Sequence, residues 1–171
     1  MKKIPFNVNA YAARLIGREN VSKLEGAILE LVKNTYDADA TICLLYYNNK
    51  DKYLLIADNG CGMNEDIIIN NWMTIGNSTK VNDFHTEKGR IQTGAKGIGR
   101  FALDRISQNC EMYTTTSSGS ILWRVDWNTF NHEKNITEIT ADIDNNSSLN
   151  VKKFLKNLNI DEMKEQFISN F

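Results

Sequence analysis

The sequence predicts one α+β domain, and three observations support this. Its 171 residues, 42% of them apolar and 24% charged, are enough for a single domain with a buried core. Residues 22–39 repeat apolar side chains at the spacing of an amphipathic helix. Two pairs of short segments read as strands that are joined by polar turns: 41–47 with 53–57, and 110–116 with 120–126.

Caps, turns and side-chain spacing indicate the other elements. Ser22-Lys23-Leu24-Glu25 fits a capping box at the start of the long helix, and Asn64 is a candidate cap for a second helix. Polar clusters at 48–51 and 117–119 predict the hairpin turns. The other predicted helices are 10–16, 65–73, 101–106, 150–157 and 161–167, and the other predicted strands are 4–8 and 136–143.

Residues 76–99 form the longest stretch without a periodic pattern. They are polar and rich in glycine. A loop of this length in a compact domain is usually a functional lid or a disordered segment. We therefore predict a mobile lid over about residues 76–99.

Composition argues against several classes of protein. A formal net charge of −1 provides no overall electrostatic attraction to DNA or to an anionic membrane. No run approaches the ~20 apolar residues of a membrane span, and no apolar stretch follows the first lysines as in a signal peptide. We expect a soluble, cytoplasmic protein with no direct readout of nucleic-acid sequence.

Cysteine, histidine and tryptophan side chains are not expected to form a site. Their spacing matches no metal centre or catalytic triad. We expect reduced thiols, structural or surface histidines, and tryptophans that pack in the core. These residues are Cys43, Cys61, Cys110, His85, His132, Trp72, Trp123 and Trp127.

A first polar cluster, Glu30-Leu31-Val32-Lys33-Asn34-Thr35-Tyr36-Asp37-Ala38, lies on the long helix. Glu30, Asn34 and Asp37 are spaced i, i+4 and i+7, so they form one stripe. Such a stripe is most often a solvated helix face. Over a cavity, Asn34 could instead offer Mg²⁺ a neutral oxygen, and Glu30 could deprotonate a water aimed at a terminal phosphorus.

A second cluster, Asp58-Asn59-Gly60-Cys61-Gly62-Met63, follows an apolar run. Asn-Gly is strong turn chemistry, so a simple turn explains it equally well. Alternatively, Asp58 accepts a hydrogen bond from the amino group of adenine. Gly60 and Gly62, which lack Cβ, would then let the base lie against the backbone. Guanine presents an oxygen at that position and would be repelled.

A third cluster, Gly94-Ala95-Lys96-Gly97-Ile98-Gly99-Arg100, precedes a predicted helix. Successive N–H groups and the positive end of a helix form an anion site, although a flexible loop tip is the other interpretation. This is not a P-loop, because the lysine lies inside the glycines and no hydroxyl follows it. Lys80 and Arg100 are candidates to add positive charge near phosphates.

Taken together and in this order, the clusters resemble the N, G1 and G2 boxes of the GHKL superfamily. That superfamily includes DNA gyrase, the heat-shock chaperones, histidine kinases and MutL, with the MORC ATPases as relatives. The resemblance covers roughly residues 6–106. It implies the Bergerat ATP-binding fold, an α/β sandwich with helices on one face of a mixed, mostly antiparallel sheet. It also implies ATP and Mg²⁺ under a mobile lid.

The resemblance assigns roles to individual residues. Glu30 matches the general base, Asn34 the magnesium ligand and Asp58 the adenine acceptor. Residues 75–80 resemble the segment that opens the lid. Further contacts to the nucleotide are expected from Asp37, Gly60, Gly62, Met63, Lys80, Gly94, Lys96, Gly97, Ile98, Gly99 and Arg100.

Two details narrow the choice within the superfamily. Histidine kinases typically place asparagine at the position that matches Glu30, and the Gly-x-Lys-Gly-Ile-Gly-Arg form is most similar to bacterial MORC-like ATPases. After Asp142, however, we find no strand with the threonine that such families use at the nucleotide. We therefore expect 1–171 to be a single domain from the N-terminal part of a longer protein, with a sheet truncated at its C-terminal end.

The leading hypothesis is Mg-dependent ATP binding and slow hydrolysis that drive lid closure and conformational switching or homodimerisation. Downstream domains of the same protein would be further partners. A histidine-kinase-like phosphotransferase is the first alternative, disfavoured by Glu30. A non-catalytic module that binds nucleotide or a partner is the second.

Overall fold

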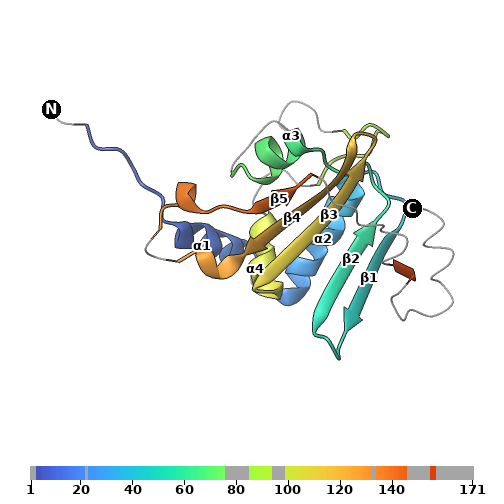
Figure 1. Ribbon diagram of the computed structural model, residues 1–171, viewed down its shortest axis with the longest axis horizontal. Helices are drawn as coiled ribbons and strands as arrows, with labels where there is room; N and C mark the ends of the chain where they lie inside the picture. The colour runs from blue at the N-terminus through green and yellow to red at the C-terminus, as the bar shows by residue number, and fades with distance from the viewer. Residues whose placement is uncertain are drawn as a thin grey trace.

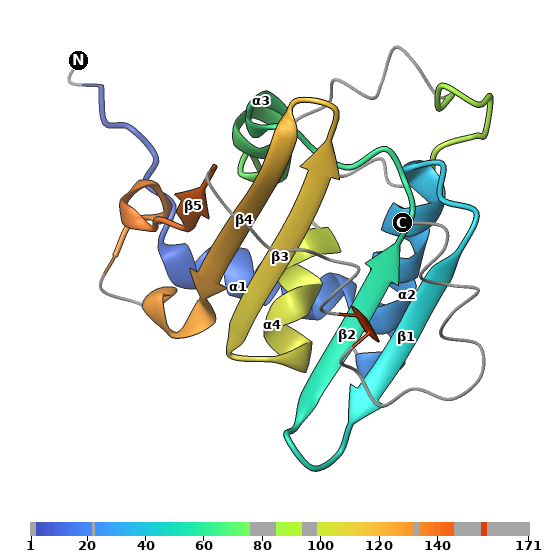
Figure 2. The same ribbon diagram turned by 45° about the vertical axis from the view of Figure 1, so that its right-hand side comes forward.

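The protein is a β layer covered on one face by helices. The computed structural model describes residues 3–21, 23–75, 85–93, 99–131, 134–145 and 155–156. Helices α1, α2 and α4 lie behind the two long hairpins, which run side by side (Figures 1 and 2). All strand pairs among the described residues are antiparallel. The predicted α+β class, with helices on one face, is confirmed.

The two predicted hairpins are present. Strand β1 (Cys43–Asn48) pairs with β2 (Tyr53–Asp58), so that Cys43 lies opposite Asp58. Strand β3 (Asn109–Thr116) pairs with β4 (Gly119–Asp126). A three-residue strand, β5 (Asp142–Asp144), pairs with the other edge of β4.

The two N-terminal helices differ from prediction at their ends. Helix α1 (Ala10–Asn20) is longer than predicted and is capped by the Asn9 side chain, which accepts a hydrogen bond from the Tyr11 N–H at 2.8 Å. Helix α2 (Leu24–Asp37) has Lys23 at its N-cap, without a side-chain cap bond. The predicted capping residue, Ser22, lies outside the described residues.

Helix α2 ends at Asp37, two residues before the predicted end. Asp39 has a φ of 59°, in the left-handed region. A right-handed helix cannot continue through that conformation. The chain therefore leaves the helix axis here and turns towards β1.

The later helices are short. Asn64 caps α3 (Glu65–Ile67) by accepting from the Ile67 N–H at 2.9 Å, and the helix continues as a π-helical turn (Ile68–Trp72). A 3₁₀ turn (Gly99–Ala102) leads into α4 (Leu103–Ile106). The predicted helices 65–73 and 101–106 are thus confirmed as helical regions. Of 150–157 and 161–167, only Leu155 and Lys156 are described, and both are helical.

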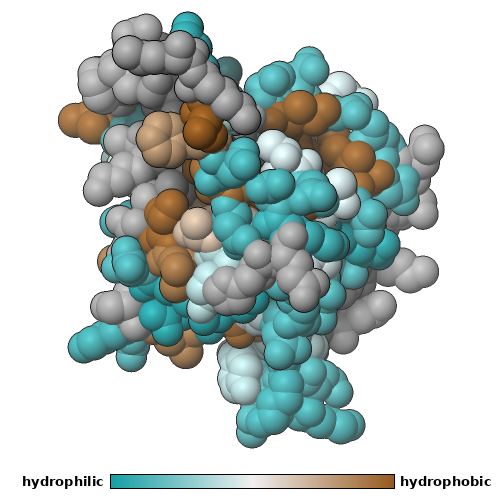
Figure 3. Space-filling model, turned by 90° about the vertical axis from the view of Figure 1, so that its left-hand side faces the viewer, coloured by the Kyte–Doolittle hydropathy of each residue, from teal (hydrophilic) through white to brown (hydrophobic). Residues whose placement is uncertain are grey.

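Two strand predictions were wrong. Residues 4–8 are extended but join no sheet, and Ile4, Phe6 and Val8 are 80%, 103% and 51% exposed. They form an arm that leaves the body (Figure 1), on the side whose surface shows apolar patches among polar groups (Figure 3). An extended segment becomes a strand only if a partner edge supplies hydrogen bonds, and sequence spacing does not reveal the partner.

The predicted strand 136–143 is mostly absent. Residues Ile136–Glu138 form a 3₁₀ turn, closed by a capping box in which the Glu138 side chain accepts from the Asn135 N–H at 2.6 Å. Within the predicted range, the Ile136 N–H donates to the Val8 carbonyl at 3.0 Å and the Ile139 N–H to the Ile136 carbonyl at 3.3 Å, so these groups do not enter the sheet. Only β5, at the end of the predicted range, pairs with a neighbour.

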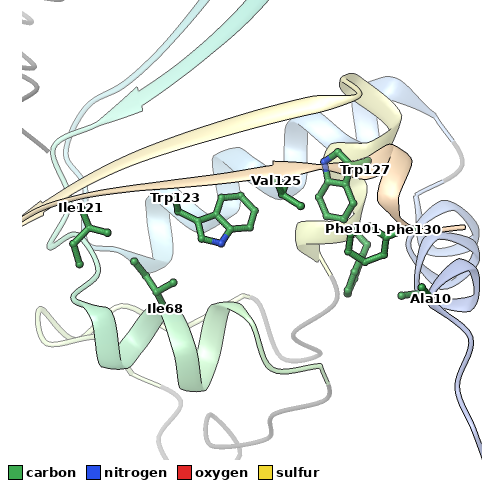
Figure 4. Close-up of a cluster of buried hydrophobic side chains, with 9 residues drawn as sticks. Ala10, Ile68, Phe101, Ile121, Trp123, Val125, Trp127 and Phe130 are labelled. Atoms are coloured by element: carbon green, nitrogen blue, oxygen red, sulfur yellow. The ribbon is translucent and has the colours of Figure 1, made fainter. Parts of the chain in front are cut away.

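The main core lies between β4 and the helices (Figure 4). Trp123 and Trp127 are 3% and 2% exposed, and Trp72 lies edge-on to Trp123 with ring centroids 5.8 Å apart. The expected packing role of the tryptophans is confirmed. The other buried members are Ala10, Ala13, Ile68, Phe101, Ile121, Val125 and Phe130. In the part of the chain that is described, no helix has the length and apolar character needed to cross a membrane.

Candidate functional site

The chain that follows β2 lies against the C-terminal end of α2. The Cys61 N–H donates to the Ala38 carbonyl at 2.9 Å, and a Cβ on Gly60 would lie 2.7 Å from the Ala38 Cβ. Residues 58–63 are therefore held beside the helix that carries Asn34 and Asp37. Two of the three predicted clusters are brought together.

Gly60 and Gly62 are needed for a reason that the sequence did not indicate. Gly62 has a φ of 70°, and a Cβ there would collide with the Thr115 carbonyl oxygen on β3. At Gly60 a Cβ would collide with Ala38. Both glycines thus permit the protein backbone to approach itself closely. Their predicted contact with a base stays a prediction.

Asp58 is half-buried at the end of β2. Its carboxylate accepts the Gly60 N–H at 2.8 Å, and the described residues supply no other donor. Burial raises the pKa of Asp58, and the hydrogen bond from Gly60 offsets part of that rise. A carboxylate can accept several hydrogen bonds, so this one keeps capacity for a donor group of a ligand.

Thr114 was not identified from the sequence. It is 8% exposed on β3, its hydroxyl accepts the Met63 N–H at 2.6 Å, and it donates to the Met63 carbonyl at 3.3 Å. Alternation along the strand places Cys110, Met112 and Thr114 on the inward face. A threonine at an inward strand position needs buried partners, and this was the signal that could have found it.

The three residues of the α2 stripe have different surroundings. Glu30 forms an ion pair with Lys33 at 2.8 Å, and their side chains are 32% and 39% exposed. Asn34 is half-buried, and the described residues give its side chain no hydrogen-bond partner. Asp37 accepts both the N–H and the hydroxyl of Thr93, at 2.8 and 3.1 Å. Asp37 therefore already serves to hold the segment 85–93.

Most of the third cluster is not described. Gly94, Lys96, Gly97 and Ile98 lie outside the described residues, as does Lys80 earlier in the chain. Gly99 begins the 3₁₀ turn before α4. Their phosphate contacts stay predictions.

Arg100 is buried beside Trp72. Its guanidinium donates to the carbonyls of Asn71 and Thr74, each at 3.0 Å, and lies 5.7 Å from the Trp72 ring. Burial lowers the pKa of Arg100 to about 10. These bonds give the side chain a packing role at the end of the π-helical turn, and its phosphate contact stays a prediction.

Asn34 on α2 could act as a ligand of a magnesium ion that takes its other ligands from phosphates and water. In the described ranges, no three His, Cys, Asp or Glu side chains are grouped to hold a metal. Asn34 offers one neutral oxygen at the proposed position. Mg²⁺ typically takes one or two protein oxygens, with phosphates and water as the other ligands.

The chain matches a known family over most of its length. Residues 21–157 match the family described as histidine kinase-, DNA gyrase B- and HSP90-like ATPases. The protein therefore belongs to this family, and the GHKL resemblance is confirmed. Its function is of the ATP-binding, ATPase type.

One relative is a protein of Herpetosiphon aurantiacus described as a putative type II restriction enzyme, HgiDII. The two are 35% identical over 86 residues, which is 50% of this chain and 14% of the relative. The chain thus spans a small part of that protein.

Proposed function

We propose that the protein binds Mg·ATP where the ends of α2 and β2 meet and hydrolyses it slowly. The observation that carries this proposal is the junction between Cys61 and Ala38, which holds residues 58–63 beside the end of α2. It brings the acceptor Asp58 to the helix that carries Asn34 and Glu30. An adenine acceptor and the groups suited to phosphate chemistry then share one side of the domain.

Asp58 is the proposed acceptor for the adenine amino group. It is half-buried and takes one hydrogen bond from Gly60. Thr114 bonds the Met63 N–H, and the two glycines permit the close packing of the backbone around Asp58. A buried acceptor favours a ligand that donates there, so ATP should bind in preference to GTP.

Glu30 and Asn34 are the proposed groups at the phosphate end. A bound Mg²⁺ would neutralise charge on the phosphate oxygens, with Asn34 as its protein ligand. Glu30 would orient and deprotonate the attacking water. Its ion pair with Lys33 holds the carboxylate on this part of the helix. The further proposed phosphate contacts are Lys80, Gly94, Lys96, Gly97, Ile98, Gly99 and Arg100.

We further propose that ATP binding closes the lid and promotes a homodimer, as the leading hypothesis from the sequence holds. The relative's description as a restriction enzyme supports a place for this switch in a protein that acts on DNA. Because its net charge is −1, we propose that this domain would supply the ATP-dependent conformational change in such a protein and would not itself recognise the DNA sequence.

A calorimetric titration tests the binding proposal. ATP, ADP and GTP are titrated with and without Mg²⁺. We expect saturable binding of the adenine nucleotides, strengthened by Mg²⁺ for ATP and much weaker for GTP. Equal binding of ATP and GTP would remove the proposed role of Asp58.

Hydrolysis tests the role of Glu30. Glu30→Gln should keep ATP binding and lose roughly 10²–10⁴-fold in hydrolysis rate, the usual contribution of a general base. Glu25→Gln, in the exposed first turn of the same helix, is the matched control and should hydrolyse normally. With γ-labelled ATP, label released as phosphate supports an ATPase, and label retained on the protein supports the phosphotransferase alternative.

A further inference from the structure

We propose that Asp39 is a positioning residue, whose carboxylate holds the segment 85–93 against the end of α2 and thereby sets Thr93 beside the nucleotide site. The docking of this segment stands on the structure alone. Its effect on nucleotide binding rests on the proposed function. The two parts can therefore fail separately.

Both oxygens of the Asp39 carboxylate are used by the segment. The side chain is 8% exposed; Oδ1 accepts the Thr86 hydroxyl at 2.5 Å, and Oδ2 accepts the Lys88 N–H at 3.0 Å. The Lys88 ammonium in turn donates to the Asp39 carbonyl at 3.1 Å. A buried carboxylate with this many donors is a fixed attachment point.

Arg90 extends the attachment to two backbone carbonyls, one at the end of α2 and one just after it. Its Nε lies 3.8 Å from Asp39 Oδ1, and its Nη1 donates to the carbonyls of Ala40 and Tyr36 at 2.7 and 3.2 Å. The guanidinium also lies over the Tyr36 ring, 4.9 Å from its centroid. Tyr36 lies in the last turn of α2 and Ala40 three residues past its end, so Arg90 joins the segment to the C-terminal end of α2.

The backbone conformation at Asp39 distinguishes two possible reasons for the residue at this position: ending the helix, or supplying a carboxylate. Its φ of 59° is a conformation that glycine adopts at lower cost than any other residue. If the position served only to end the helix, glycine would be the better residue. The aspartate is therefore explained by its carboxylate, which a glycine would lack.

The attached segment ends at the proposed site. Thr93 donates two hydrogen bonds to Asp37, one turn after Asn34 on α2. Thr86 and Arg90 are joined within the segment, because the Thr86 hydroxyl accepts the Arg90 N–H at 3.0 Å. Asp39 thus acts on the site through the segment and touches no proposed ligand.

The test compares Asp39→Gly with Lys52→Gly. Lys52 is the other described non-glycine residue with positive φ, at 54° in the β1–β2 turn, so the control relieves the same backbone strain far from the segment. Hydrogen exchange is followed at the amides of Lys88 and Thr93 without nucleotide. We expect exchange at least about 10-fold faster in Asp39→Gly and unchanged in Lys52→Gly.

The second measurement is the affinity for Mg·ATP by calorimetry. We expect Asp39→Gly to weaken binding by roughly 3–10-fold, and Lys52→Gly to leave it unchanged. Wild-type exchange rates in Asp39→Gly would overturn the docking role. Faster exchange with unchanged affinity would overturn the positioning role. If the wild type bound no nucleotide, the proposed function would fail, while the exchange result would still decide the docking.

Asp39→Asn provides a second variant that keeps the side-chain shape and tolerates the left-handed backbone. It should fold as the wild type does and show a smaller rise in exchange, because the amide oxygen can still accept one hydrogen bond. Exchange and affinity that match the wild type in Asp39→Asn would show that the negative charge is not required. That result would also overturn the role assigned to the carboxylate.

Discussion

Asp39 follows α2 and Asp58 ends β2, two neighbouring elements of the same domain, but the protein surrounds the two carboxylates in opposite ways. Asp39, just after α2, is bonded by Thr86 and Lys88 and paired with Arg90. Asp58, at the end of β2, takes one hydrogen bond from Gly60 among the described residues. The comparison separates a carboxylate that is bonded by the protein itself from one that we propose is available to a ligand.

The pKa values of the two carboxyls shift in opposite directions. At Asp39, burial acts to raise the pKa, but the hydrogen bonds from Thr86 and Lys88 and the charges of Arg90 and Lys88 together lower it. At Asp58, burial dominates and the pKa is raised. Buried carboxylates without full compensation are typical of binding and catalytic sites, whereas saturated ones are typical of structural contacts.

The largest expected effect is on nucleotide affinity. Asp58→Ala should weaken adenine-nucleotide binding by about 1.5–3 kcal/mol, the scale of a hydrogen bond to a charged group. Asp51→Ala, in the exposed turn between β1 and β2, is the control and should bind as the wild type does. Calorimetry measures both. If Asp58→Ala kept full affinity, the contrast between the two aspartates would have no functional meaning.

A second prediction tests whether the β2 end is held from the β3 side. Thr114→Val should lower the free energy of unfolding by roughly 1–3 kcal/mol, because the Met63 N–H loses its buried partner. Thr115→Val, exposed on the same strand, should change it by less than about 0.5 kcal/mol. Urea denaturation measures both values. Equal effects would mean that Thr114 does not hold residues 58–63.

The acid dependence of stability should differ between the two aspartates. Because the folded-state pKa of Asp39 is lowered, its stabilisation is full above the ordinary value of 3.8 and is lost as pH falls through the lower folded pKa. Because the pKa of Asp58 is raised, its contribution to stability increases as pH falls through the folded pKa towards 3.8.

Thermal melts of Asp39→Asn and Asp58→Asn across about pH 3–7 test these signs. Asp39→Asn should be less stable than the wild type at neutral pH and lose less stability on acidification. Asp58→Asn should be at least as stable at neutral pH and lose more on acidification. If both variants lost less stability than the wild type on acidification, or both lost more, the opposite pKa shifts of the two aspartates would be contradicted.

The smallest expected effect concerns the ion pair of Glu30 with Lys33. Both side chains are about a third exposed, so Lys33→Gln should lower the free energy of unfolding by only about 0.2–0.5 kcal/mol. Urea denaturation measures this change, and the hydrolysis rate reports whether Lys33 orients Glu30. A stability loss well above this range would show that the pair is part of the fold.

The elements with local signals were predicted well. The hairpins follow from β-forming runs around polar turns, and Asn64 caps its helix as expected, because these signals act within a few residues. The segment 4–8 and most of 136–143 were predicted wrongly. A strand needs an edge to pair with, and the sequence does not show which edge is near.

The family was predicted correctly from the site motifs, and the roles of the individual site residues stay predictions. The clusters around Glu30, Asp58 and Gly94 led to the correct family, because each concentrates chemistry in a few adjacent residues. Thr114 was missed, since its partner Met63 is 51 residues away in the chain. The packing role of Arg100 was missed for the same reason, because its acceptors lie on another element.

By itself, the sequence determined the ATPase family, the α+β class and the polar side chains available near the ends of α2 and β2. The tertiary structure alone decided how those side chains are used. Asp39 follows an amphipathic helix and Asp58 ends a strand, and both are aspartates at the end of an element. Only the segment 85–93 supplies donors to both carboxylate oxygens of one of them, Asp39. A buried carboxylate is fully hydrogen-bonded only if the fold brings donors to it from distant parts of the chain. The local sequence does not encode where those donors lie.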